Sequence, residues 1–269
     1  MTGSSSGRGI GGGIGCGNAD PSGLDTAQGG SGGGPLIVLL HGLGGNSGAW
    51  SNLLPLLAGR RWLIVDLPGH GWSPALTSYS YSCCAEMVSA ALPEDGNVVV
   101  LGHSFGGAVG LALAAVRPLR RIVTVGMRAS WPPEFTATLD TLAVKPVRGF
   151  GSREDAAAFL LRINGLSDFL PADSEFVERG LVHGESGWRL AQDPRSFAVG
   201  VPPFDSLFAE AVSAGAAVTV AHGERDSMVA VGDYDDFASR YGVEVVVLSG
   251  LGHNAHVESP QAVAGLLPT

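Results

Sequence analysis

Six short apolar segments, each followed by a stretch of helical or loop character, constrain the fold of this chain most strongly. They are rich in branched residues and too short for buried helices, which is typical of strands covered on both faces. Strands that alternate with crossover segments form parallel sheets, so we predict an α/β fold with a mainly parallel sheet and helices on both faces. The segments are Leu36–Leu40, Trp62–Val65, Val98–Leu101, Arg121–Gly126, Ala217–Ala221 and Glu244–Leu248.

The spacing of these segments predicts three regions. Residues 1–34 are rich in Gly and Ser and offer few side chains to bury, so we expect a disordered tail. Residues 127–208 contain helical pieces and no convincing strand, and we expect them to form a helical lid, called the insertion below. Residues 35–126 and 209–269 then make up the core, and the insertion covers the edge of the sheet where ligands bind in α/β folds.

The composition narrows the class of partner. The chain has 269 residues, a formal net charge of −9 and 45% apolar residues, so it can bury a sizeable core. An acidic chain without basic clusters disfavours nucleic acid and anionic membranes, and no apolar run is long enough to span a bilayer. No histidine pair suits a metal, and we expect no cofactor. The three cysteines show no disulfide framework and no apolar leader is visible, so we expect a soluble, cytoplasmic protein that acts on a small molecule.

A G-x-S-x-G pattern surrounds Ser104. Gly102-His103-Ser104-Phe105-Gly106 follows the predicted strand Val98–Leu101 and precedes a helical segment that ends before Pro118. A serine on a sharp strand-to-helix turn needs small neighbours, which the glycines supply, and the helix N-terminus favours developing negative charge. The pattern and its context predict that Ser104 is a nucleophile.

Several motifs occur in an order that resembles the α/β-hydrolase superfamily, and in particular its small serine esterase, thioesterase and C–C hydrolase branch. The resemblance covers about residues 35–126 and 215–269, whereas the insertion resembles nothing specific. The motifs that carry it are HGLGGN at 41–46, DLPGHGWS at 66–73, GHSFGG at 102–107, HGERD at 222–226 and LGHNAHVESP at 251–260.

The order of a catalytic triad in this fold, serine then acid then histidine, selects further candidates. Asp226 follows a strand at the edge where Ser104 lies, and it would orient the histidine. Its rivals are Asp205, Asp233, Asp235 and Asp236, and the last three of them look like a helix start, where aspartate is common. His253 follows the last strand through a Gly-rich turn and is the predicted general base. His256 is its competitor, three residues further on.

Two backbone N–H groups would form an oxyanion hole. The first belongs to Phe105, the residue after the candidate nucleophile. The second lies in the loop after Leu36–Leu40, where the resemblance implies Leu43, the residue after His-Gly.

The remaining candidates concern the substrate. Trp50, Trp131 and Trp188 are possible walls of an apolar pocket, although core or lid packing is the commoner role of a tryptophan. Arg128 either binds a substrate carboxylate or forms a salt bridge of the insertion.

The leading interpretation of the function is hydrolysis of a carboxylic ester or thioester of a small to medium, largely apolar substrate through an acyl-Ser104 intermediate. C–C bond hydrolysis, lactone opening, perhydrolysis, lyase chemistry and a triad-retaining ligand receptor remain alternatives on the same residues.

Overall fold

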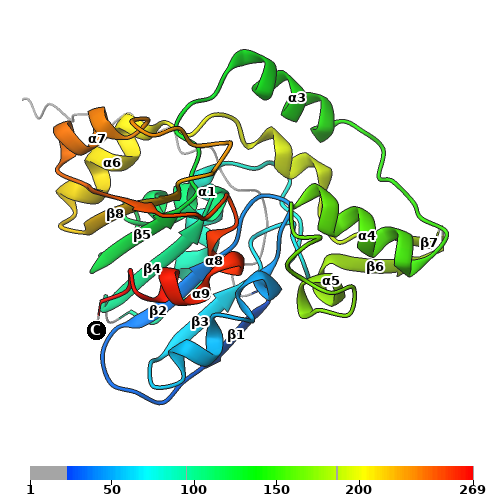
Figure 1. Ribbon diagram of the computed structural model, residues 1–269, viewed down its shortest axis with the longest axis horizontal. Helices are drawn as coiled ribbons and strands as arrows, with labels where there is room; N and C mark the ends of the chain where they lie inside the picture. The colour runs from blue at the N-terminus through cyan, green and yellow to red at the C-terminus, as the bar shows by residue number, and fades with distance from the viewer. Residues whose placement is uncertain (1–22, 95, 186, 269) are drawn as a thin grey trace, which may run out of the picture.

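A seven-stranded sheet forms the centre of the computed structural model, which describes residues 23–94, 96–185 and 187–268 (Figure 1). The strand order is β1-β3-β2-β4-β5-β8-β9, and every neighbouring pair except β1 and β3 is parallel. The predicted α/β class is therefore confirmed. The strands are β1 (Thr26–Gly29), β2 (Leu36–Leu40), β3 (Trp62–Val65), β4 (Val98–His103), β5 (Arg121–Val125), β8 (Ala217–Gly223) and β9 (Glu244–Leu248).

Strand β1 corrects the prediction of a disordered tail for its last residues. Thr26–Gly29 pairs antiparallel with β3 at the edge of the sheet. This pairing uses backbone hydrogen bonds, so it needs no apolar pattern in the side chains. Gly29 also suits its place, because a Cβ there would lie 2.3 Å from the Trp62 ring. Residues 1–22 of the predicted tail lie outside the described residues.

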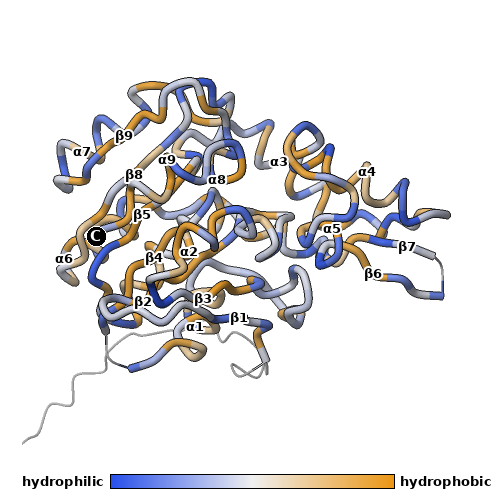
Figure 2. Tube along the Cα trace, turned by 60° about the horizontal axis from the view of Figure 1, so that its bottom comes forward, coloured by the Kyte–Doolittle hydropathy of each residue, from blue (hydrophilic) through white to orange (hydrophobic). Residues whose placement is uncertain are grey.

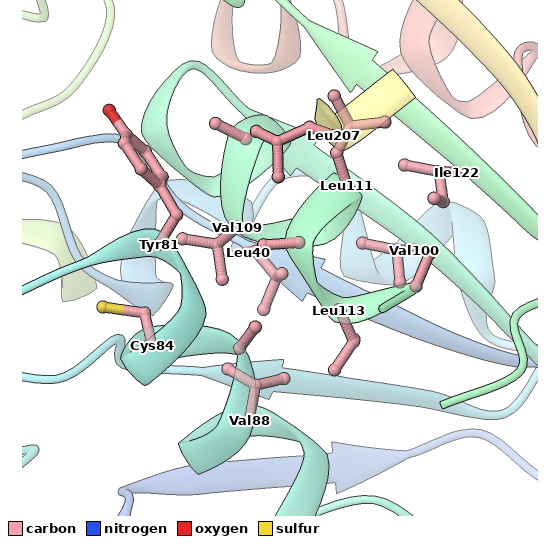
Figure 3. Close-up of a cluster of buried hydrophobic side chains, with 14 of the residues drawn as sticks. Leu40, Tyr81, Cys84, Val88, Val100, Val109, Leu111, Leu113, Ile122 and Leu207 are labelled. Atoms are coloured by element: carbon pink, nitrogen blue, oxygen red, sulfur yellow. The ribbon is translucent and has the colours of Figure 1, made fainter. Parts of the chain in front are cut away.

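Apolar side chains alternate between the two faces of the sheet, as strand geometry requires. In β2, Val38 and Leu40 join a cluster under helices α1 (Tyr81–Ala90), α2 (Phe105–Leu113) and α6 (Phe204–Ser213). Figure 3 shows this packing, and Figure 2 colours β4, β8 and α2 as hydrophobic. Ile37 and Leu39 join a second cluster on the opposite face. That face carries the short elements η2 (Ser47–Trp50), η3 (Leu54–Leu57), α8 (Ala255–Glu258) and α9 (Pro260–Ala264).

The insertion between β5 and β8 stands largely to one side of the sheet (Figure 1). It is not purely helical, because β6 and β7 form an antiparallel hairpin that the sequence did not reveal. Both strands are short and lack a regular apolar alternation. At its end, α6 starts at Phe204 and packs on α2, so residues 204–208 belong to the packed core and not to the insertion. Its elements are α3 (Pro133–Ala143), α4 (Arg153–Ile163), α5 (Glu175–Gly180), β6 (Leu181–Gly184), β7 (Gly187–Leu190) and η4 (Pro194–Val199).

Smaller features complete the fold. The segment between β2 and β3 contains the 3-10 turns η2 and η3, and Asn46 caps the first of them. Helix α7 (Asp235–Tyr241) begins with acidic residues, as predicted for this stretch. Cys84 of α1 is a buried free thiol. None of the helices in the described parts of the chain has the length and hydropathy to cross a membrane.

Candidate active site

Ser104 lies on a strained turn between β4 and α2. Its φ of 48° and ψ of −113° make it the one residue other than glycine with positive φ in the described ranges. Such a conformation costs on the order of 1–3 kcal/mol, and the surroundings must enforce it. They do so by close packing, because a Cβ on Gly102 would lie 2.4 Å from the Gly106 carbonyl oxygen and one on Gly106 would lie 2.3 Å from that of Leu40.

Asp226 and His253 form a hydrogen-bonded pair beyond the ends of β8 and β9. The distance from His253 Nδ1 to Asp226 Oδ2 is 3.0 Å and that to Oδ1 is 3.2 Å. The carboxylate is buried, and its Oδ1 also accepts the Met228 N–H at 2.8 Å. Since a carboxylate accepts and the imidazole nitrogen must donate, Nδ1 carries the proton and Nε2 is left as the basic atom.

Ser104 and His253 line the same cavity, which has a volume of about 490 Å³ and is called the Ser104 pocket here. Leu43 and Phe105 line it as well. Neither of their backbone N–H groups donates to another group in the described part of the chain, so both can donate to a ligand. His41 holds the loop that carries Leu43.

The His41 contacts are specific. Its Nδ1–H donates to the Gly42 carbonyl at 2.8 Å, and its Nε2 accepts the Leu67 N–H at 2.8 Å. A neutral imidazole satisfies both bonds at once. His41 therefore supports the loop that carries Leu43 by hydrogen bonding to both of its neighbours in the fold.

Comparison with known proteins identifies the family of the chain. A sequence profile described as the alpha/beta hydrolase family covers residues 37–266. The chain belongs to this family. A solved thioesterase domain from the curacin biosynthetic pathway superposes with a TM-score of 0.74 at 22% identity, over 90% of this chain and 94% of that one. At this identity the likeness shows the hydrolase fold alone.

Curated relatives match parts of this hydrolase chain. A pimeloyl-[acyl-carrier protein] methyl ester esterase of Aeromonas hydrophila is 43% identical over 37% of this chain and 42% of its own length. A protein of the same name from Klebsiella pneumoniae is 34% identical over 66% of this chain and 64% of its own length. The chain thus spans less than half of the first relative and just under two thirds of the second.

Two further histidines surround His253 in this hydrolase site. Strand alternation turns His103 to the face of α8, where its Nε2–H donates to the His253 carbonyl at 3.1 Å. The His256 ring lies 4.1 Å from that of His103 and 4.7 Å from that of Trp50. Both residues lie close in sequence to the triad candidates, since His103 precedes Ser104 and His256 follows His253 by three residues. Only the fold shows that the imidazole rings of His103 and His256 pack together beside His253.

Burial lowers the pKa of several of these histidines. Desolvation lowers the pKa of His256 to about 3, with the nearby His253 acting in the same direction. The pKa of His70, beside His41, falls to about 3 for the same main reason. Desolvation also places the pKa of His103 and that of His41 below the usual histidine value. These groups are therefore neutral in the folded protein near neutral pH.

We expect the free energy of unfolding to decrease as pH falls below about 6.5, because the unfolded chain then takes up protons that the folded chain refuses. Each such histidine contributes at most about 1.4 kcal/mol per pH unit in the window between its unfolded and folded pKa values. Urea unfolding at pH 7.5, 6 and 5 measures the slope. His70→Gln should flatten it, whereas His183→Gln, at an exposed position, should not. Equal stability at the three pH values would contradict the expectation.

Two asparagines that sequence reasoning missed, Asn164 of the insertion and Asn254 of the core, link these two regions. Asn254, next to His253, donates from Nδ2 to the Asn164 carbonyl at 2.8 Å, and Asn164 donates to the Gly44 carbonyl at 3.4 Å. The end of α4 is thereby tied to both the Leu43 loop and the His253 loop. No sequence motif identifies Asn164, because its hydrogen bonds to Gly44 and Asn254 depend on how the insertion packs against the core.

The four predicted pocket residues divide into two pairs. Arg128 and Trp131 line the Ser104 pocket. Trp50 does not line the pocket. Its side chain is fully buried in the apolar cluster that contains Leu39, on the face of the sheet covered by η2, η3, α8 and α9. Trp188 lies in β7 and packs into the apolar cluster of the insertion. Both residues were wrong as pocket candidates, because a lone tryptophan without periodic context does not reveal which cavity it faces.

Proposed function

We propose that this protein is a serine hydrolase that cleaves a carboxylic ester or thioester through an acyl-Ser104 intermediate. The observation that carries the proposal is the pairing of a strained, pocket-facing serine with a histidine whose Nδ1 is fixed by a buried carboxylate. Relatives named as methyl ester esterases support the same bond type.

The residues fit the steps of acyl transfer. His253 Nε2 removes the proton from Ser104 Oγ as the oxygen attacks the substrate carbonyl. The free N–H groups of Leu43 and Phe105 stabilise the negative charge that develops on the carbonyl oxygen. Collapse of this intermediate releases the alcohol or thiol, which takes the proton from His253. Water then attacks the acyl group with the same base, and the acid leaves.

The shape of the pocket supports a largely apolar substrate of small to medium size. Its walls carry the aromatic and aliphatic side chains Tyr81, Trp131, Phe135, Leu139, Phe176 and Phe197. A volume of about 490 Å³ lies within the usual range for small-molecule sites. The insertion supplies several of these walls, which is the arrangement of a lid.

Covalent labelling tests the proposal. We expect a fluorophosphonate probe to label the wild-type protein, with the added mass on the peptide that contains Ser104, since only an activated serine reacts readily. The control is Ser104→Ala, which should not be labelled. A panel of p-nitrophenyl esters then shows whether labelling abolishes turnover. A folded wild-type protein that neither reacts with the probe nor hydrolyses any ester would overturn the proposal.

A further inference from the structure

The charged side chains that line the Ser104 pocket are positive, whereas the net charge of the chain is negative. The chain has a net charge of −9. Among the described residues, no aspartate or glutamate lines the pocket, whereas Arg128 and Arg162 do. Two guanidinium groups in the lining of an otherwise apolar cavity favour a ligand with negative charge.

Hydrogen bonds fix the start of the Arg128 segment relative to Ser104. The Ser104 N–H donates to the Val125 carbonyl at 2.9 Å, three residues before Arg128. The Gly126 N–H donates to the Ala221 carbonyl at 2.9 Å, and the Tyr234 hydroxyl donates to the Met127 carbonyl. The three residues before Arg128 are therefore held by hydrogen bonds, next to the candidate nucleophile.

The Arg128 side chain is held in place but has unused donors. Its guanidinium carbon lies 4.2 Å from the centre of the Phe135 ring, and one Nη donates to the Ser130 carbonyl at 3.2 Å. Its Nε is buried and has no hydrogen-bond partner. A buried N–H without an acceptor is costly, so a ligand acceptor that reaches this guanidinium would be favourable.

Four other arginines of the chain pair with carboxylates. Arg153, Arg179, Arg195 and Arg240 each lie within 4 Å of at least one carboxylate. No carboxylate of the described residues pairs with Arg128 in this way. The salt bridge that the sequence left open as its role is therefore not formed within the described chain.

We propose that the substrate carries a carboxylate in addition to its ester or thioester, and that Arg128 binds this carboxylate. The inference rests on the proposed function, because it places the second group in the cavity that contains Ser104. A single guanidinium matches a singly charged carboxylate, which can accept two parallel N–H bonds from it. Arg162, at the end of α4, adds positive charge to the same cavity.

Paired esters test the inference. Monomethyl esters of linear dicarboxylic acids, from succinic to suberic acid, are compared with methyl esters of monocarboxylic acids of equal chain length. We expect the ratio of kcat/KM for the charged ester to that for the neutral one to exceed unity at one or more lengths. Arg128→Met should lower this ratio roughly 10- to 100-fold, because a charge-assisted hydrogen bond is lost. Arg128→Lys should lower it less.

A matched control separates this effect from general changes in charge. Arg148 also packs over aromatic rings of the insertion, at 4.8 Å from the centre of the Phe150 ring, but it does not line the Ser104 pocket. Arg148→Met should leave the ratio unchanged. A wild-type ratio of unity or below at all lengths, or an equal ratio in wild type and Arg128→Met, overturns the inference.

A binding measurement keeps the two proposals distinguishable. Calorimetry on Ser104→Ala and on Ser104→Ala/Arg128→Met measures binding of the same monomethyl esters without turnover. Affinity that falls at least tenfold in the double variant supports carboxylate binding even if no ester is hydrolysed, in which case only the proposed function fails. Ester hydrolysis by wild type together with equal affinity of the two variants overturns the carboxylate site and leaves the hydrolase proposal intact.

Discussion

Replacing either Ser104 or His253 with Ala is expected to lower kcat for ester hydrolysis on the order of 10⁶-fold, and replacing both is expected to cost little more. The reason is that nucleophile and base act in one step: without the base the hydroxyl is a weak nucleophile, and without the hydroxyl the base has nothing to activate. Steady-state kinetics on the two single variants and the double variant measures the loss.

Asp226 completes this series with a smaller expected effect. The carboxylate does not react, but it holds Nδ1 protonated at 3.0 Å and leaves Nε2 basic. Asp226→Asn can present its amide N–H to the imidazole and so favour the wrong tautomer, with an expected loss on the order of 10⁴-fold. Near-UV circular dichroism of each variant serves as the control for folding. Losses that multiply in the double variant would contradict the concerted role of Ser104 and His253.

The location of Ser104, Asp226 and His253 at one edge of the sheet could be predicted from the sequence for a geometric reason. Each follows a strand recognisable as a short apolar run, and the carboxyl ends of parallel strands meet at the same edge. The structure places Asp226 and His253 within hydrogen-bond distance and Ser104 and His253 on one cavity. Their catalytic roles remain predictions for the kinetic series above.

The failures have physical reasons as well. Thr26–Gly29 was missed because an edge strand held by backbone bonds carries no apolar period. The hairpin β6–β7 was missed because its strands are only four residues long and half-exposed. Trp50 and Trp188 were misplaced because the fold of neighbouring segments, not the local sequence, decides which side of the chain is buried. Asn164 acts across 90 residues, and no local pattern carries such a contact.

A buried ion-pair network was equally invisible in the sequence, and it joins the insertion to the core. Arg179 of α5 lies 2.8 Å from an Asp25 carboxylate oxygen, 3.2 Å from one of Asp66 and 3.3 Å from one of Glu175. The Asp66 side chain is fully buried, and it also accepts the Ser47 N–H at 2.7 Å. The guanidinium therefore neutralises a carboxylate that has no access to solvent.

Replacing Arg179 with Met is expected to lower the free energy of unfolding by about 3–5 kcal/mol, because it leaves the buried Asp66 charge without a partner. Urea unfolding at pH 7.5 measures the change. The matched control is Arg153→Met, which breaks the more exposed pair with Glu178 in the same insertion and should cost no more than about 1 kcal/mol.

The double variant Arg179→Met/Asp66→Asn decides whether the charge itself is responsible. If the cost arises from an uncompensated carboxylate, removing that charge should restore part of the stability lost in Arg179→Met, although both ends of the ion pair are now gone. If the cost arises instead from the packing of the Arg179 stem and its guanidinium over Trp72, at 4.2 Å from the ring centre, the second substitution should add to the loss. An Arg179→Met cost as small as that of Arg153→Met would show that the buried ion pairs stabilise the fold no more than an exposed pair does.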